Sequence, residues 1–145
     1  MNFTVAAAIS AAGMDVESAR MNAAAINLAN VHTTRSAEGG PFRPLRVVSG
    51  TSQSGFGTLM QRTASAYLPM ASVVSVERPV VSPRLVHEPA HPDADARGFV
   101  AYPGIDATSE MVGLMTAVRA YEANVVAVNA AKSMALRALD IGSST

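Results

Sequence analysis

The sequence has no cysteine and no tryptophan among its 145 residues, and only three tyrosines and four phenylalanines. Without cysteine, the chain can form neither a disulfide nor a thiolate metal site. Apolar residues are common, but many of them are alanine, so few bulky side chains remain to form a hydrophobic core within the single chain. This combination suits a subunit that neighbours cover better than a compact monomer.

Charge is also scarce. Charged residues make up 15% of the chain and the formal net charge is zero. Because bulk charge would not attract a polyanion, we expect no nucleic acid partner. No stretch approaches the ~20 apolar residues that a spanning helix needs, and the first basic residue is Arg20. We therefore expect neither a transmembrane helix nor a cleaved signal peptide.

All eight prolines lie between Pro41 and Pro103. Residues 3–30 contain no proline and a single glycine, Gly13, and residues 106–141 contain no proline and, in their interior, only Gly113. Because proline interrupts helices, the ends of the chain are predicted to be helical and the middle is not.

Apolar residues in the C-terminal segment recur at spacings of three and four, which predicts one face of a helix about 50 Å long. Asp106 or Ser109 is expected to cap this helix, with Glu110 at its positive end. Lys132 and Arg137 are expected near its negative end, and Gly142 is the predicted stop. The row consists of Met111, Leu114, Val118, Tyr121, Val125, Val128, Lys132, Ala135 and Leu139, of which all but Lys132 are apolar.

The N-terminal segment carries two such rows on nearly opposite faces, which implies neighbours on both sides of the helix. One row is Ala7, Ala11, Met14, Ser18, Met21, Ala25 and Leu28, and the other is Val5, Ile9, Ala12, Val16, Ala19, Ala23 and Ile26. Small residues at Ala117, Ala120, Ala127 and Ala131 would permit close helix approach, although alanine is frequent enough here to fill any row. The predicted assembly seam is Met14, Met21, Leu28, Met111, Leu114, Val118, Tyr121, Val125, Val128, Ala135 and Leu139.

The middle of the chain is predicted to form short strands joined by turns. The expected strands are residues 45–48, 72–78, 84–87 and 98–102, and residues 50–57 are expected to form a flexible loop. The predicted class is α+β, with the terminal helices paired as a coiled-coil-like bundle and a small β-rich middle. The predicted divisions are 1–34, 35–104 with a loop around 49–57, and 105–145.

Catalytic and metal-binding patterns are weak. His87 and His91 share the spacing of a zinc protease helix, but Pro89 and Pro92 prevent a regular helix there, and His32 is far away in sequence. Asp93 and Asp95 have no base or nucleophile signature nearby. We expect no enzyme activity, no metal and no cofactor.

The run Asn27-Leu28-Ala29-Asn30-Val31-His32-Thr33-Thr34 resembles the segment that follows the first helix in the flagellar axial proteins, which include rod, hook and hook-associated subunits. The continuation Glu38-Gly39-Gly40-Pro41 is similar to the proximal-rod branch of this family. The segments 83–95 and 98–103, and the final helix with Arg119-Ala120-Tyr121-Glu122-Ala123-Asn124, also match. His87, where tyrosine is usual, and Pro44, where a basic residue is usual, depart from the pattern. The motif residues are Asn27, Leu28, Ala29, Asn30, Thr34, Gly39, Gly40, Pro41 and Asn124.

This resemblance covers about residues 1–48 and 78–142. It implies a structural subunit of the proximal rod, the periplasmic drive shaft that carries torque from motor to hook. The implied partners are other rod subunits and itself, components of the basal-body base and export gate, the flagellar type III export apparatus and a peptidoglycan-associated scaffold. The alternatives are another axial subunit, such as a sister rod or hook protein, and a free coiled-coil adaptor.

Overall fold

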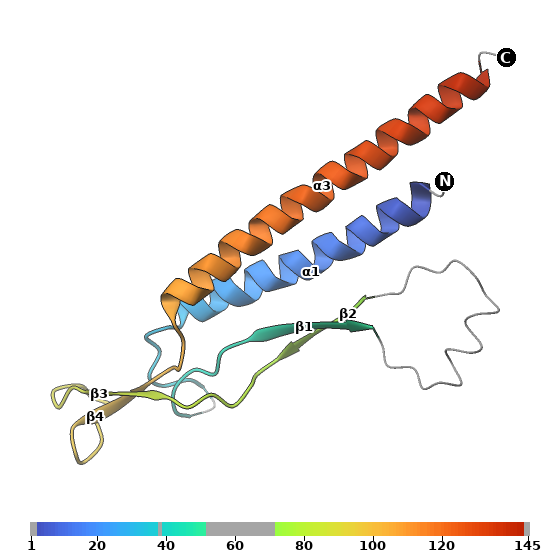
Figure 1. Cartoon of the computed structure of the whole chain (residues 1–145). Helices are drawn as coiled ribbons and strands as arrows, with labels where there is room; N and C mark the ends of the chain where they lie inside the picture. The colour runs from blue at the N-terminus through green and yellow to red at the C-terminus, as the bar shows by residue number, and fades with distance from the viewer. Residues whose placement is uncertain (1–2, 38, 52–71, 144–145) are drawn as a thin grey trace, which may run out of the picture. The chain divides into compact units, whose positions relative to one another are not determined.

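The computed structural model describes residues 3–37, 39–51 and 72–143 of the chain (Figure 1). Along the sequence, four short strands lie between two long helices. In chain order the elements are α1 (Phe3–Ala29), β1 (Arg46–Thr51), β2 (Ser72–Glu77), β3 (Arg84–His87), β4 (Phe99–Tyr102) and α3 (Ala107–Ser143). The predicted α+β class, with a long helix at each end and strands between them, is confirmed.

The described chain divides into two compact units. Unit 1 comprises Met1–Ala19, Ser49–Ser75 and Ala117–Thr145, and unit 2 comprises Arg20–Val48 and Val76–Thr116. Each unit therefore contains a part of both helices.

The two predicted rows of α1 differ in burial at a few positions. In the row that begins at Val5, Val16 and Ala23 are 8% and 7% exposed, whereas Ile9 and Ile26 are 59% and 40% exposed. On the opposite row, Met14 and Met21 are half-buried and Ala11 is exposed. The two predicted rows therefore differ in environment within the chain.

The start of α3 is fixed by Asp106, as one of the two capping predictions expected. The Asp106 carboxylate accepts hydrogen bonds from the backbone N–H of Thr108 (3.2 Å) and of Ser109 (3.3 Å), and from the Ser109 hydroxyl (2.7 Å). These are the bonds of a helix N-cap. Ser109 is thus not the cap itself but a partner of the capping side chain.

The end of α3 differs from the prediction in two ways. The helix continues past Gly142 to Ser143, and its last turn contains no basic residue. Gly142 fails to stop the helix because glycine permits a terminating conformation without imposing one. Lys132 and Arg137 lie further from the end than expected because the helix is longer, beyond the reach of its terminal dipole.

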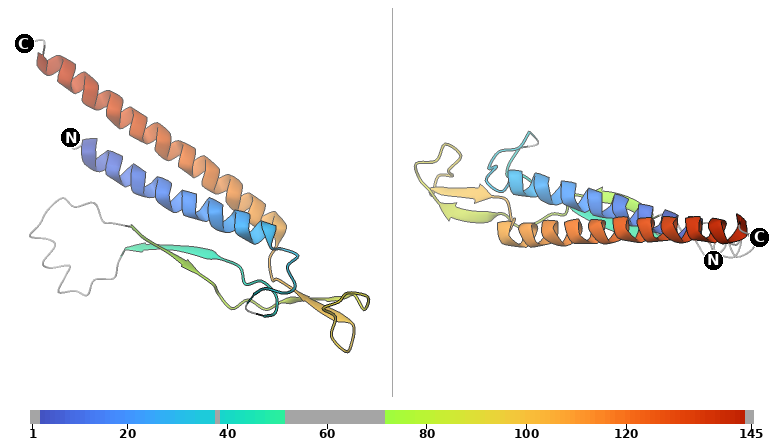
Figure 2. Two further views of the ribbon diagram at one scale, coloured as in Figure 1. Left: turned by 180° about the vertical axis from the view of Figure 1, so that it is seen from behind. Right: turned by 90° about the horizontal axis from the view of Figure 1, so that it is seen from above.

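The strands form two separate two-stranded sheets, β1 with β2 and β3 with β4. The β3–β4 pair is antiparallel (Figure 2). In its register Leu85 lies opposite Ala101 and Val86 opposite Val100. Asp95 closes the connection, because its side chain accepts hydrogen bonds from the N–H groups of Arg97 and Phe99 (both 2.8 Å). All four expected strands are present: the strand at 84–87 has the expected bounds, and the other three have shifted ends.

The predicted loop at residues 50–57 begins too early, because Gly50 and Thr51 belong to β1. Pairing with β2 supplies hydrogen-bond partners that a composition rich in serine and glycine does not reveal. The remainder of that prediction, residues 52–57, lies outside the described residues.

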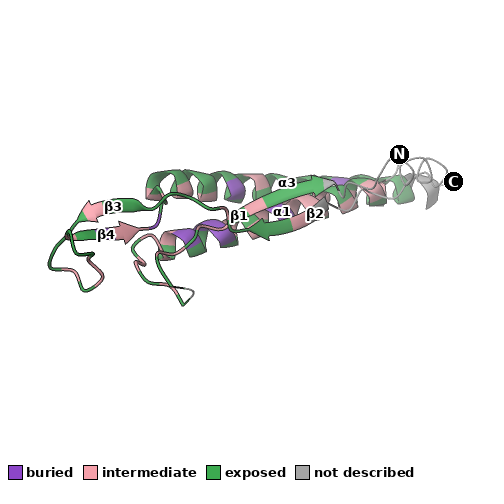
Figure 3. Ribbon diagram, turned by 90° about the horizontal axis from the view of Figure 1, so that it is seen from below, coloured by how far each residue is buried: buried purple, intermediate pink, exposed green. Residues whose placement is uncertain are grey.

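The core of the described chain is built from small side chains. The largest side chains that are fully buried are Val100, Asn27 and Pro103, all in unit 2. Most positions along α3 are exposed or half-buried (Figure 3). Large apolar residues such as Met115, 62% exposed, remain on its surface.

By length and apolar composition alone, Ala107–Asp140 of α3 could cross a membrane. The expectation that no segment meets this criterion is therefore wrong. It failed because alanine supplies much of the apolar composition of this segment. Arg119, Glu122 and Lys132 are exposed on the same helix, and such side chains are costly in hydrocarbon.

Acid should weaken the N-terminal cap of α3. Hydrogen bonds from the Ser109 hydroxyl and from the Thr108 and Ser109 N–H groups lower the pKa of Asp106 below its ordinary value of 3.8. A carboxyl whose pKa is lower in the folded state stabilises the fold above its ordinary pKa and loses that contribution as the pH falls through the folded-state value. We expect the amide NMR shifts of Thr108 and Ser109 to titrate below pH 3.8.

The matched control is Asp106→Asn, which keeps a capping oxygen but cannot ionise. The titration of both amides should disappear in this variant. An unchanged titration in Asp106→Asn would show that another group governs the start of α3.

Candidate functional site

The side chain of Asn27 occupies the centre of unit 2. It is 2% exposed, although it lies in the last turns of α1. Its Nδ2 donates to the Leu45 carbonyl (2.9 Å) and to Oε2 of Glu110 (3.1 Å), and its Oδ1 accepts from the Leu45 N–H (2.7 Å). The amide thus joins the end of α1, the residue before β1 and the first turn of α3.

Only an amide fits this arrangement. The two bonds to Leu45 pair the side chain with both main-chain groups of that residue, as a neighbouring strand would. A carboxylate at position 27 would face both the Leu45 carbonyl and Glu110 without a proton to donate. The charge of Glu110 strengthens its bond with the amide.

The segment after α1 is a tight loop stabilised by its own side chains and main chain. Asn30 Nδ2 donates to the Ile26 carbonyl (2.8 Å), and the Thr33 hydroxyl donates to Asn30 Oδ1 (3.1 Å). The Phe42 N–H donates to the Thr33 carbonyl (3.1 Å), which brings the loop back on itself. The polar residues of the motif therefore end α1 and turn the chain toward Leu45.

Gly39 and Gly40 allow this loop to turn. Their φ angles are +83° and +75°, in the left-handed region that residues with a Cβ rarely adopt. The Ser36 N–H donates to the Gly40 carbonyl (2.8 Å) across the turn. The motif glycines are thus required by backbone conformation, while Glu38 lies outside the described residues.

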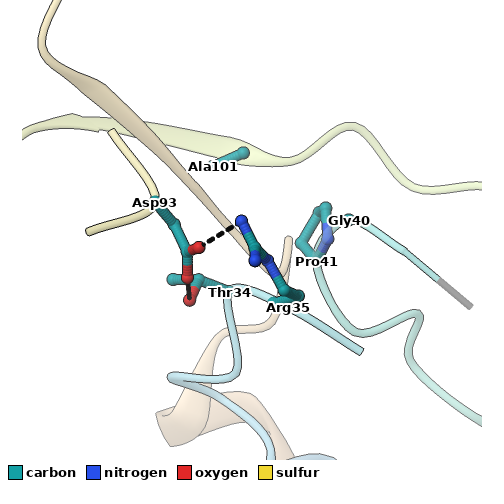
Figure 4. A pocket seen from close by; sticks show the side chains of 6 residues that line it. All are labelled: Thr34, Arg35, Gly40, Pro41, Asp93 and Ala101. Atoms are coloured by element: carbon teal, nitrogen blue, oxygen red, sulfur yellow. Dashed lines mark hydrogen bonds and ion pairs between the residues drawn. The ribbon is translucent and has the colours of Figure 1, made fainter. Parts of the chain in front are cut away.

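The loop is attached to the β3–β4 connection through Asp93. Arg35 Nη2 lies 2.7 Å from Asp93 Oδ1, and the Thr34 hydroxyl donates to Asp93 Oδ2 (2.8 Å). Around them is a pocket of about 200 Å³ lined by Thr34, Arg35, Gly40, Pro41, Asp93 and Ala101 (Figure 4). The Arg35 side chain is 74% exposed, so the ion pair alone adds little stability.

A cluster of rings lies near the same connection. Tyr102 donates its hydroxyl hydrogen to Glu88 Oε2 (2.9 Å), and the Arg84 guanidinium lies 5.7 Å from its ring centroid. The hydrogen bond to Glu88 is the main cause that raises the pKa of Tyr102 above 10.0. His32 and His91 meet the Tyr102 ring edge-on, at 6.2 and 6.4 Å between centroids. His32 and His91 therefore contribute to packing around the Tyr102 ring.

In unit 1, Gly13 lies against Asn124 of α3. A Cβ atom at Gly13 would come within 2.9 Å of the Asn124 side-chain amide, closer than real Cβ contacts allow. The Asn124 Nδ2 also donates to the Ala120 carbonyl of its own helix (3.0 Å). Glycine therefore provides room here for a polar side chain on the facing helix.

The predicted seam residues lie in mixed environments. Leu114, Val125, Val128 and Ala135 are half-buried, as are Met14, Met21 and Leu28. Met111, Val118, Tyr121 and Leu139 are exposed. The most buried positions of α3 are instead Ala117 and Ala131, at 3% and 4% exposure. The predicted row therefore borders the face that is buried within the chain.

The motif residues divide into a buried centre and an accessible rim. Asn27 is buried; Leu28, Asn30, Thr34, Pro41 and Asn124 are half-buried; Ala29, Gly39 and Gly40 are exposed. Sequence reasoning missed the contacts of Arg35, Asp93 and Glu110, because each partner is distant along the chain. Their residue types are common on protein surfaces and gave no signal.

Replacing Asn27 should destabilise unit 2 far more than a conservative change at Glu110. Asn27→Ala leaves both main-chain groups of Leu45 unpaired, which should cost about 1–3 kcal/mol of unfolding free energy. Glu110→Gln keeps a carbonyl oxygen as acceptor and should cost about 1 kcal/mol or less. Urea titration of the purified chain, followed by circular dichroism, measures both. Equal losses would show that the Leu45 pairing contributes nothing measurable.

Comparison with known proteins finds similarity in sequence. The family model described as flagellar basal body rod FlgEFG protein C-terminal matches residues 96–141. The chain is 36% identical to the flagellar basal-body rod protein FlgC of Escherichia coli O157:H7 over 134 residues, covering 92% of this chain and 93% of that protein. FlgC of Salmonella typhimurium gives the same values. FlgC of Bacillus subtilis is 35% identical over 141 residues, covering 92% and 94%.

Proposed function

Because the chain belongs to the FlgC family of flagellar basal-body rod proteins, we propose that α1 and α3 pair to form its assembly core. As a member of this family it is a structural rod subunit and not an enzyme. It assembles with other basal-body rod components. In this proposal the paired helices meet those neighbours, and the β-rich middle lies outside them.

The main support for contact with neighbouring subunits is the exposed apolar surface of α3. Met111, Met115 and Val118 follow one another at helical spacing and are 50%, 62% and 38% exposed. On the other side of the helix, Ala117 and Ala131 are almost completely buried. A helix with one face buried within the chain and apolar residues on another needs further partners for the second face. Neighbouring rod subunits supply that cover.

Two contacts support pairing of α1 with α3 as a coiled-coil-like bundle. Asn27 of α1 donates to Glu110 of α3 in unit 2. Gly13 of α1 lies against Asn124 of α3 in unit 1. The divisions 1–34, 35–104 and 105–145 then separate the two core helices from the middle.

Assembly also explains how a chain with so small a core becomes ordered. In the free chain the apolar faces of the helices meet water, and the helices are partly disordered, a state suited to passage through the type III export apparatus without a cleaved signal peptide. In the rod, neighbours bury those faces, and this burial stabilises the assembly by about 25 cal/mol per Å² of apolar area removed from water. The rod then crosses the periplasm as a stiff shaft that transmits torque.

The further partners follow from this location. The rod begins at the basal-body base and export gate and passes a peptidoglycan-associated scaffold. A sister rod or hook subunit is the nearest alternative, and the similarity to FlgC across 92% of the chain favours FlgC. A free coiled-coil adaptor would instead form a stable dimer in solution.

Charge placed on the predicted seam should block assembly. Leu114→Asp with Val118→Asp puts two carboxylates on the apolar surface that neighbours are proposed to cover, and burying them unpaired is unfavourable. We expect loss of the subunit from isolated basal bodies and loss of swimming motility. The control is Thr116→Asp with Arg119→Asp, on the same turns of α3. Motile cells carrying the seam variant would show that the seam is assigned wrongly.

Hydrogen exchange should separate the free and assembled states. Amides of residues 3–30 and 106–139 should exchange faster in the purified chain than in isolated basal bodies, because only the rod covers both faces of each helix. Mass spectrometry of the two samples measures the difference. Equally strong protection in the free chain would favour the adaptor alternative.

A further inference from the structure

We propose that two contacts, the hydrogen bond of Asn27 with Glu110 and the packing of Asn124 against Gly13, select a single register for the paired terminal helices. This inference rests on the proposed pairing of α1 with α3 and adds the residues that determine its alignment. Each contact lies inside one of the two units.

The spacing of the two contacts is the same on both helices. Gly13 and Asn27 are fourteen residues apart on α1, and Glu110 and Asn124 are fourteen residues apart on α3. Their order is reversed, since the earlier residue of α1 meets the later residue of α3. Fourteen residues are two heptads, so one antiparallel register satisfies both contacts.

By sequence spacing the same register pairs Ala131 of α3 with Ala6 of α1, one heptad beyond the Gly13–Asn124 contact, although Ala6 itself is exposed. Ala131 is among the most buried residues of the described helices. Ala117, one heptad before Asn124, is equally buried. On α3 the row of positions seven residues apart is thus half-buried at Glu110 and Asn124 and buried at Ala117 and Ala131, so that none of its members is exposed.

Alanine alone would not select this alignment. A row of small side chains presents nearly the same surface after a shift of one heptad, so competing registers differ little in packing energy. Such a shift would move one helix along the other by about 10 Å. The surface presented to neighbouring subunits would move with it.

The polar residues make the shifted registers unfavourable. Gly13 is the single glycine of α1, and only there is the space open for Asn124. A shift of one heptad in one direction places Asn124 opposite Ala6, and a shift in the other direction places Asn124 opposite Arg20. In both cases a side chain occupies the space that Gly13 leaves open. Asn27 would meet Ala117 or leave the helix altogether, and its bond to Glu110 would be lost.

Disulfide trapping tests the register, because the natural chain contains no cysteine. One variant carries Ala6→Cys with Ala131→Cys, which face each other in the proposed register. Its partner carries Ala6→Cys with Ala138→Cys, which face each other after a slip of one heptad. The purified full-length chains are equilibrated in glutathione buffer, and intrachain disulfides are quantified by peptide mass spectrometry. In a partly ordered chain, a disulfide forms in those molecules whose helices are paired, so the disulfide yield reports on that fraction.

The contacts are then removed in both cysteine backgrounds. Glu110→Ala with Asn124→Ala deletes one partner of each contact while Asn27 keeps its bonds to Leu45. Gly13→Ala is an independent variant, which fills the space that Asn124 needs. Circular dichroism confirms that each variant retains its helices.

With the natural residues present, the 6–131 disulfide should exceed the 6–138 disulfide at least about tenfold, since a hydrogen bond to a charged group is worth more than 1.4 kcal/mol. In the Glu110→Ala with Asn124→Ala background the ratio should fall to near one, and Gly13→Ala, which leaves the Asn27–Glu110 bond in place, should lower the ratio by less. A tenfold preference that survives loss of both Glu110 and Asn124 would overturn the register proposal and leave the pairing intact. A ratio near one with the natural residues would overturn the register and leave the pairing in place. If neither intrachain disulfide formed, the pairing itself would be overturned, while membership of the rod family would stand.

Discussion

The arrangement of unit 2 depends on a buried side-chain amide, that of Asn27. An amide in the last turns of α1 satisfies both main-chain groups of Leu45 and reaches Glu110 in the first turn of α3. Because a buried polar group without partners is costly, each of these segments holds the others in place. The path of the chain from α1 into β1, and its attachment to the first turn of α3, depend on this one group.

A second constraint is the small size of the side chains along the helices. Alanines at 117 and 131 allow close approach but remove little apolar area from water. The gain from burial within one chain is therefore modest against the entropy lost when long helices become ordered. The larger apolar side chains of α3, such as Met115 and Val126, remain outside, where they can stabilise only an assembly.

Much of the fold follows from local patterns in the sequence. The confinement of proline to the middle predicted both helices, and the Asp106 cap was one of two expected alternatives. The strands were found because turn residues bounded them. The end of α3 and the start of the loop after β1 were misplaced, because glycine and serine permit irregular structure without imposing it.

The candidate site could be predicted only in part. The motif drew attention to Asn27 and Asn124, but neither Glu110 nor Gly13 was identified as a partner. Arg35 and Asp93 were overlooked for the same reason, since pairing across the fold leaves no local periodicity. The α3 row predicted from bulky residues lies beside the buried alanines and not on them, because periodicity cannot separate a face buried within the chain from one that neighbours cover.

The bond between Asn27 and Glu110 spans 83 positions of the sequence. Whichever end of the chain emerges first from a narrow channel, this bond cannot close until the second of its two residues has also emerged. The local turns after α1 can form earlier, since their partners are close along the chain. The order of folding therefore follows the distances along the sequence, and the junction closes after the local turns have formed.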